Sequence, residues 1–460
     1  MQTGDRIQSQ LSSYAAALAY EQCDDDTVHA AKVRVIDTFG ALVGGFAGDP
    51  CRIARDIAAQ MPNPNGATII GTDIRTAPDL AAFANGTTAR YVEMNDVYHW
   101  PGSSGGHPSD VLMPIFAAAE RAHTSGRDFI TAVILGYEVY LRLSDAVKTS
   151  GFDCANFCCI GAALGAGKLF GLDLNGLAEC LSMAVVPNNA LNQARTGHLS
   201  MWKAVAAGQS GRAGVFAALL AQAGMRGPHM PFEGKNGWSD HVARHPVSLD
   251  TFGGPGVPFK IHDTLIKPRA SCATTISSIL AAEKAAVGVP AVEAIEKVTV
   301  EVYERAKTGM GTGEHHWNPD SRETADHSIP YVVAASLIDK QLTPKSFANE
   351  RLWSAELRAL LPRIEVVADP EFTEAYERVP VEHRTRVTVV LKSGEQLIGY
   401  AGGEAGDLSQ RRSDAEIEDK FRALTCDALT PKGSEAALRL LWRLDAVPDV
   451  AEIPAFFRFT

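Results

Sequence analysis

Residues 155–170, ANFCCIGAALGAGKLF, decide how the first half of this chain folds. Almost all of these side chains are small and apolar. That composition suits a helix in a buried position that packs closely against other helices. Each glycine costs about 1 kcal/mol in a helix interior, so close packing has to offset the cost. We therefore expect 155–170 to be a buried helix of a helical domain.

The segments around this stretch also have helical patterns. Residues 26–45 carry apolar side chains at three- and four-residue spacing, and the pattern ends at Gly44-Gly45. Residues 201–224 predict another long Ala-rich helix, which ends at Gly224. No strand alternation of useful length occurs in residues 1–265. The residues expected to cap helices are Ser109 or Asp110, Asp128, Ser413 with Glu416, and Ser434.

The pattern changes after about residue 265. Residues 296–303 and 363–369 alternate in the manner of strands, and 384–400 predicts a hairpin around a KSGE turn. Residues 329–341 and 343–362 predict helices between these strands. The fold class is therefore mainly α with an α+β second domain. We expect a helical domain made of 1–265 and 404–460, with an α+β domain of 266–403 inserted.

Composition excludes several classes of protein. The chain has 460 residues and a formal net charge of −11, whereas a nucleic-acid binder needs a basic face. No apolar run reaches the roughly 18 residues of a membrane span. The N-terminal segment does not resemble a signal peptide, and none of the eight cysteines forms a CxxC pair. We expect a cytoplasmic protein that binds neither nucleic acid nor membrane.

Four segments concentrate residues able to do chemistry. Each also has an ordinary interpretation, as a capped surface loop, a lysine whose ammonium reaches water past its own stem, or a charged linker. The candidates in 85–114 are Arg90, Glu93, Asp96, His99 and His107, around a Gly/Ser loop. Those in 196–212 are His198, Lys203 and Arg212, with Arg195 directly before the segment. Those in 259–278 are His262, Lys267, Arg269 and Cys272, and those in 315–336 are Arg322, Asp326, His327 and Tyr331.

Metal and thiol chemistry have weaker support. The pair His315-His316 has no third ligand at a recognisable spacing, and metal sites need three or four ligands. Cys154, Cys158 and Cys159 lie on the small-residue helix, where cysteine usually acts as a small buried hydrophobe. A nucleophilic cysteine needs a histidine or a cation beside it, and the sequence alone does not place one.

Taken in order, these segments resemble the MmgE/PrpD family over nearly the whole chain. The landmarks are VIDTFGALVGG, GGHPSD, SMWK, IKP, RETADHSIPY, VADPEFTEAY and SDAEIEDKFRAL. Family members include 2-methylcitrate dehydratase and cis-aconitate decarboxylase. The resemblance implies a large all-helical domain with a smaller α+β lid, a homodimer, and a small di- or tricarboxylate substrate. It also implies no metal and no organic cofactor.

The resemblance also implies roles for particular residues. His107 exchanges a proton, Lys203 and Lys267 bind substrate carboxylates with Arg269 as a further candidate, and Tyr331 hydrogen-bonds the substrate. Glu93 stands at the family's acidic position. The remaining candidates for substrate contact are Arg90, Asp96, His198, Cys154 and Cys272. The expected reaction is proton abstraction beside a carboxylate with loss of water. The alternatives are an epimerase or isomerase, a decarboxylase and a non-catalytic carboxylate-binding protein.

The chain departs from the family pattern at four places. Glu93 replaces the usual Asp, and Val97 replaces a Thr. Residues 151–154, GFDC, lack the family's histidine. Cys272 stands near the place of a histidine that often follows the IKP lysine. Because two proton-carrying positions are changed, the exact reaction stays open among these alternatives.

Overall fold

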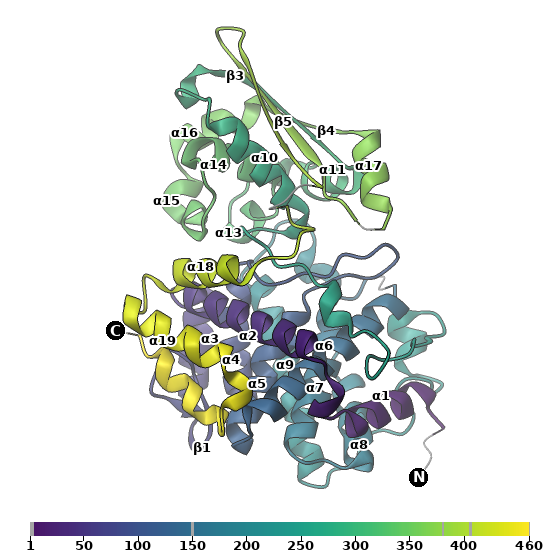
Figure 1. The fold of residues 1–460 in the computed structure, drawn as a ribbon. Helices are drawn as coiled ribbons and strands as arrows, with labels where there is room; N and C mark the ends of the chain where they lie inside the picture. Colours follow the sequence, from purple (N-terminus) through teal and green to yellow (C-terminus); the bar gives the residue numbers. More distant parts are fainter. Residues whose placement is uncertain (1–3, 149–150, 380, 404–406, 460) are drawn as a thin grey trace.

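The computed structural model describes residues 4–459 except 149–150, 380 and 404–406. A large helical body lies below a smaller part that contains a β-sheet (Figure 1). We call these parts the body and the lid. The mainly α fold with an α+β second domain is confirmed. Within the described residues, no helix has the length and apolar character needed to cross a membrane.

The body is built around α7 (Ala155–Leu169), the buried small-residue helix that the sequence predicts. It packs against α6 (Gly126–Ala146) and α9 (Trp202–Gln222), and α9 packs in turn against α4 (Pro78–Tyr91). Close approach depends on glycine, since a Cβ at Gly214 of α9 would lie 2.6 Å from the Cys159 carbonyl. The other body helices are α1 (Arg6–Ala17), α3 (Asp49–Ala59), α5 (Leu112–Ala122) and α8 (Leu174–Val185).

Helices from both ends of the chain lie side by side in the body. Figure 1 shows α18 (Asp414–Thr425) and α19 (Pro431–Trp442) next to α2 (Asp25–Gly45). Gly40 and Gly44 of α2 leave room for Phe421 and Leu424 of α18. The predicted capping box of Ser413 and Glu416 begins α18. The exact domain boundaries after residues 265 and 403 stay a prediction.

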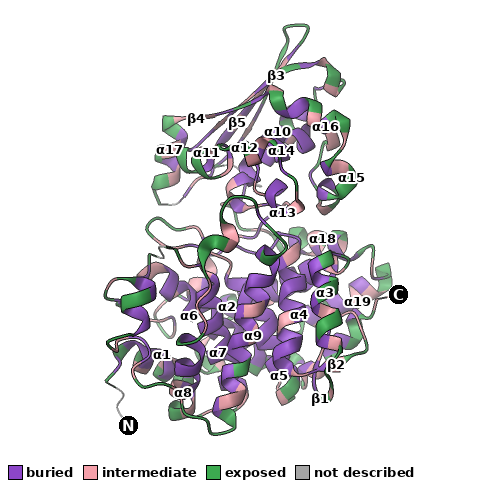
Figure 2. Cartoon of the chain, turned by 180° about the vertical axis from the view of Figure 1, so that it is seen from behind, coloured by how far each residue is buried: buried purple, intermediate pink, exposed green. Residues whose placement is uncertain are grey.

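The lid contains a four-stranded mixed sheet with the order β4-β3-β5-β6. β3 (Ile295–Val302) pairs in parallel with β4 (Ile364–Ala368) and antiparallel with β5 (Thr385–Leu391), which pairs with β6 (Gln396–Ala401). α10 (Ile276–Ala286) and α14 (Ile329–Asp339) cover this sheet, and Figure 2 shows their buried faces. The other lid helices are α11 (Glu304–Met310), α12 (Glu314–Trp317), α13 (Arg322–Ala325), α15 (Asn349–Leu352), α16 (Ala355–Leu360) and α17 (Pro370–Glu377).

Three of the expected helix caps are wrong. A 3₁₀ turn over Pro108–Val111 precedes α5, so Ser109 and Asp110 lie inside that turn and cap nothing. Ser125, not Asp128, caps α6, because its hydroxyl accepts the Asp128 N–H. Thr430 caps α19 with a proline in the first turn, and Ser434 lies one turn farther in.

Two element predictions also need correction. A small hairpin of β1 (Pro62–Thr68) and β2 (Arg75–Thr76) occurs in the half where no strand was expected. Its strands lack clear alternation because one pair is bulged and the second strand is only two residues long. Residues 343–362 form α15, α16 and short 3₁₀ turns rather than one helix, with Pro344 and Pro362 in the first turns of two of these pieces.

Candidate functional site

A buried carboxylate, Glu93, lies at the centre of a group of cationic side chains. Glu93 follows the C-terminus of α4 and has a left-handed φ of 56°, which turns the chain at this point. Arg90 holds the carboxylate with both terminal nitrogens, at 2.6 and 3.1 Å. Lys203 of α9 and Lys267 reach it at 3.0 and 2.8 Å. We call Glu93, Arg90, Lys203 and Lys267 the Glu93 cluster.

The electrostatics of the Glu93 cluster keep its carboxylate ionised. Burial by itself would raise the pKa of Glu93, but Arg90, Lys203 and Lys267 together hold it well below its usual range. Burial lowers the pKa of Lys267, and Glu93 partly opposes that shift. Each of these side chains is at most 4% exposed. The cluster is therefore a closed, charged unit inside the protein.

Lys203 also connects the body to the lid. Its ammonium lies 2.6 and 2.8 Å from the two oxygens of Asp326, which follows α13. Burial would raise the pKa of Asp326, but Lys203 and His327 outweigh it and the pKa is lowered. One lysine therefore bridges two carboxylates, one from each part of the molecule.

His107 faces the cluster with an unprotonated nitrogen. Its backbone N–H donates to the Tyr140 hydroxyl at 3.0 Å, and its Nδ1 lies 2.8 Å from the Asp96 carbonyl. A carbonyl only accepts, so Nδ1 carries the hydrogen and Nε2 is the acceptor in the neutral ring. Nε2 lies 3.8 Å from Glu93. Burial, with Arg90 and Lys267, lowers the pKa of His107 well below its usual range, so the ring is neutral at pH 7.

Positive charge exceeds negative charge at this site. Within the described residues, Arg90, Lys203 and Lys267 face the two carboxylates of Glu93 and Asp326. A third acid, Asp110, lies 3.6 Å from Arg90, but burial raises its pKa to about 7 and so reduces its negative charge. An excess of buried cations favours binding of an anion.

A cysteine and a histidine border the cluster on the lid side. The Cys272 N–H donates to the Asp326 carbonyl at 3.0 Å, and Nδ1 of His327 donates to the Asp326 carboxylate at 2.6 Å. The His327 ring lowers the pKa of the Cys272 thiol to about 7, against the effect of burial. Cys272, His327 and His107 are partly exposed, in contrast to the Glu93 cluster.

The structure thus brings several predicted site residues together. Glu93, Arg90, Lys203, Lys267 and His107 form one group with Cys272 at its edge. Asp96 lies behind His107 and holds the ring through its backbone carbonyl, while its carboxylate accepts the Ser109 N–H at 3.1 Å. The functional roles of these residues stay predictions.

Four other predicted residues lie outside this group. The Tyr331 hydroxyl donates to the Ser346 carbonyl at 2.7 Å inside the lid. Arg269 forms a bidentate ion pair with Glu283. His198 is exposed and pairs with Asp320. The Cys154 thiol contacts Asp153, and Asp153 forms an ion pair with Arg195 at 2.9 Å. Burial raises the pKa of the Cys154 thiol to about 12.

Sequence reasoning named Asp326 and His327 as candidates but gave them no role at the site. Both belong to RETADHSIPY, one of the landmarks of the family resemblance, and they precede Ser328, which caps α14. Only Tyr331 was given a role from that segment. The sequence did contain a signal for this part of the site. An Asp-His pair stands directly before the helix cap Ser328, and Lys203, on an otherwise apolar helix, needs a buried partner of opposite charge.

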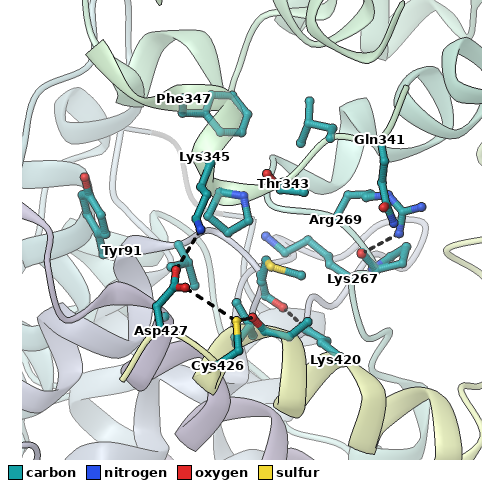
Figure 3. A pocket seen from close by; sticks show the side chains of 18 of the residues that line it. Tyr91, Lys267, Arg269, Gln341, Thr343, Lys345, Phe347, Lys420, Cys426 and Asp427 are labelled. Atoms are coloured by element: carbon teal, nitrogen blue, oxygen red, sulfur yellow. Dashed lines mark hydrogen bonds and ion pairs between the residues drawn. The ribbon is translucent and has the colours of Figure 1, made fainter. Parts of the chain in front are cut away.

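A cavity of about 790 Å³ lies beside the cluster, between the body and the lid (Figure 3). Lys267 and Arg269 border it, as do Tyr91, α18 and the lid segment 341–348. Lys345 and Asp427 form an ion pair at 3.0 Å in this view. Its lining does not include Glu93, Lys203 or His107, so the cavity is a neighbour of the cluster.

The rings of His315 and His316 lie 4.0 Å apart. Across the part of the chain that the structure describes, no three residues of His, Cys, Asp or Glu are grouped so that they could hold a metal ion.

Comparisons with known proteins match nearly the whole chain. The family model of the MmgE/PrpD N-terminal domain matches residues 9–249, and that of the MmgE/PrpD C-terminal domain matches residues 270–446. Human cis-aconitate decarboxylase is 24% identical over 482 residues, which cover 98% of this chain and 95% of the relative. The 2-methylcitrate dehydratases of Salmonella typhimurium and Cupriavidus necator are each 26% identical. The matches cover 86% and 90% of this chain, and 85% and 90% of those relatives.

Proposed function

Because this chain belongs to the MmgE/PrpD family, we propose that it is a lyase that acts on a small di- or tricarboxylate without a cofactor. The proposed reaction removes a proton beside a carboxylate and releases water, as in a 2-methylcitrate dehydratase. The observation that carries this proposal is the placement of a neutral His107 against a buried group of cations. The cytoplasmic location and the homodimer implied by the resemblance stay predictions.

The cations supply the binding energy for an anionic substrate. Arg90, Lys203 and Lys267 are charged, closely grouped and shielded from water, so each contributes more than it would at the surface. A substrate carboxylate near Lys203 competes with Asp326, and one near Lys267 competes with Glu93. The protein carboxylates therefore hold the cations in place before the substrate arrives.

His107 is the proposed base. The Nε2 lone pair accepts the proton on the carbon beside a substrate carboxylate, and the C–H electron pair forms the new double bond as the hydroxyl group leaves. The negative charge that develops beside the carboxylate is stabilised by the lysine ammonium groups. The Asp96 carbonyl keeps Nδ1 protonated, so Nε2 remains the acceptor throughout.

Decarboxylation is the second candidate. The similarity to human cis-aconitate decarboxylase supports it, because that match covers 98% of this chain. Loss of CO₂ also builds negative charge on a carbon beside a carboxylate, so the same cations serve both reactions. An epimerase would use the same proton abstraction and return the proton to the other face.

Incubation in deuterated water separates these reactions in one experiment. The purified protein is mixed with 2-methylcitrate, cis-aconitate or another small carboxylate, and products are identified by mass spectrometry. We expect net loss of water, whereas a decarboxylase loses CO₂ and an epimerase only exchanges the α-hydrogen. His107→Ala should lower turnover at least about 10²-fold. His198→Ala, on the exposed side chain, is the matched control. If no carboxylate is turned over, the lyase proposal fails, and a ligand that stabilises without reacting indicates a binding protein.

A further inference from the structure

Arg322 is a candidate from the sequence that the Glu93 cluster does not use. It lies in α13 of the lid and lines the cavity of about 790 Å³ between the lid and the body. Ligand pockets usually enclose about 300–1,000 Å³, so the cavity has room for a small organic molecule. The proposed reaction does not account for this space, because His107, Arg90 and Lys203 lie outside its lining.

The guanidinium of Arg322 has no carboxylate partner. Its terminal nitrogens donate to the backbone carbonyls of Pro344 and Tyr91 at 3.4 Å each, which is longer than an ordinary hydrogen bond. Its Nε has no hydrogen-bond partner among the described residues. No described carboxylate, that of the neighbouring Glu323 included, lies within ion-pair distance of it. A guanidinium presents five N–H donors, so most of this capacity is unused.

The other cations of the cavity wall are already paired. The pairs are Lys267–Glu93, Arg269–Glu283, Lys345–Asp427, Lys420–Asp37 and Arg412–Glu416, at 2.5–3.0 Å. The three carboxylates in the lining also have basic partners, so none of them neutralises Arg322. Across the residues that the structure describes, Arg322 is therefore the cation of this wall that lacks a counter-charge. Such a cation favours binding of an anion.

Two aromatic rings hold the guanidinium, one from each part of the molecule. Its central carbon lies 4.4 Å from the ring centre of Tyr91 in the body and 5.3 Å from that of Phe347 in the lid. These cation–π contacts position the group but supply no negative charge. The flat N–H fork of an arginine matches a planar carboxylate, which accepts two parallel hydrogen bonds. A carboxylate is therefore the head group that suits Arg322.

The rest of the wall favours an apolar body on the occupant. Apolar side chains from both the body and the lid line the cavity, and they are Val92, Met94, Ile266, Leu342, Ile417 and Leu424. An apolar group placed among them gains free energy by removing this surface from water. Figure 3 shows Lys345 and Asp427 at the cavity, and both side chains are exposed, so solvent reaches the cavity on their side.

We propose that this cavity is a second ligand site, separate from the Glu93 cluster, for an organic anion with its carboxylate on Arg322 and an apolar body among the apolar side chains of the wall. Such an occupant contacts the body and the lid at once, so its binding holds the lid against the body. It also adjoins Lys267, which lines the cavity and reaches Glu93 at 2.8 Å. The site does not depend on which reaction the protein catalyses.

The first test measures binding of para-benzoylbenzoate, a carboxylate with an apolar body, to the full chain by calorimetry. Arg322→Met should weaken binding at least about tenfold, because charge-assisted hydrogen bonds are lost. The neutral para-benzoylbenzamide should bind the wild type more weakly by a similar factor. Lys345→Met is the matched control, since this cation of the wall is exposed and paired, and it should change the affinity less than about threefold. No binding to the wild type, or equal losses in the two variants, would overturn the site.

The second test locates the bound probe. On irradiation the ketone of para-benzoylbenzoate attaches to a nearby C–H bond, and mass spectrometry identifies the modified peptide. We expect labels within residues 91–94, 342–348 or 417–424, which line the cavity. Ala423→Trp keeps Arg322 but fills the cavity from an exposed position on α18, so it should reduce the labelling even if Arg322→Met does not fold. Labels on the peptides of His107 or Lys203, or full labelling of Ala423→Trp, would overturn a separate site.

Discussion

The ammonium of Lys203 lies 2.6 Å from the carboxylate of Asp326, and this pair joins α9 of the body to the loop before α14 of the lid. Both side chains are almost fully buried. The same ammonium lies 3.0 Å from Glu93. The position of the lid over the body and the charge state of the Glu93 cluster therefore depend on one lysine.

Replacing Lys203 tests how much it contributes to the stability of the folded protein. Lys203→Met should destabilise the folded protein by about 3–5 kcal/mol, because two buried carboxylates lose a shared cation. The free energy of unfolding in urea measures the effect. Lys345→Met is the matched control, since its ion pair with Asp427 is exposed and should leave stability unchanged within error. Equal effects of the two substitutions would contradict the central place given to Lys203.

Asp110 should make stability depend on pH. Burial raises its pKa from 3.8 to about 7, and its Oδ2 has no hydrogen-bond partner among the described residues. Between about pH 4 and 7 the folded state therefore binds more protons than the unfolded state, so this contribution to stability falls as pH rises. The full effect is on the order of 4 kcal/mol.

Asp110→Asn removes the titration and keeps the shape of the protonated acid. The variant should be more stable than the wild type at pH 8 and similar to it at pH 4, with a flatter dependence between. Urea unfolding at several pH values measures this. A wild-type slope in the variant would show that other groups produce the pH dependence.

Much of the fold follows from local pattern. Small apolar residues in 155–170 predicted the buried helix α7, and alternation in 384–400 predicted the β5–β6 hairpin. The hairpin of β1 and β2 was missed because a bulge removes the alternation on which such predictions depend. The cap of α6 was misplaced because Ser125 and Asp128 hydrogen-bond each other, and only geometry shows which of them accepts from the backbone.

The site was less accessible to sequence reasoning. Its residues come from α4, α9 and two loops, so their distances depend on packing between segments more than 100 residues apart. The resemblance named Glu93, His107, Lys203 and Lys267, which do meet. It gave no role to Asp326, because the contacts of this carboxylate with Lys203 and His327 depend on the tertiary structure of the chain.

Gly106 should be necessary for placing His107. It has a φ of 130°, and a Cβ there would overlap the Tyr140 hydroxyl, which accepts the His107 N–H. Gly106→Ala should therefore displace the histidine, lower turnover and destabilise the protein by roughly 1–3 kcal/mol. Gly102→Ala is the matched control, because Gly102 also has a positive φ of 83° but has open space around it. Comparable losses of turnover in both variants would mean that backbone strain, not the overlap, is responsible.

Tyr331 separates the role implied by the family from the contact in this structure. Its hydroxyl donates to the Ser346 carbonyl, and its ring stacks on Phe347 inside the lid. Tyr331→Phe removes that hydrogen bond and leaves a buried carbonyl without its donor, so stability should fall by about 1–3 kcal/mol. If the hydroxyl does not reach the substrate, turnover should fall less than about tenfold, and KM should change little. Paired measurements of kcat, KM and urea unfolding decide the matter. A loss of 10²-fold or more in kcat with unchanged stability would place the hydroxyl at the substrate, and would require the loop of Ser346 to release it during turnover.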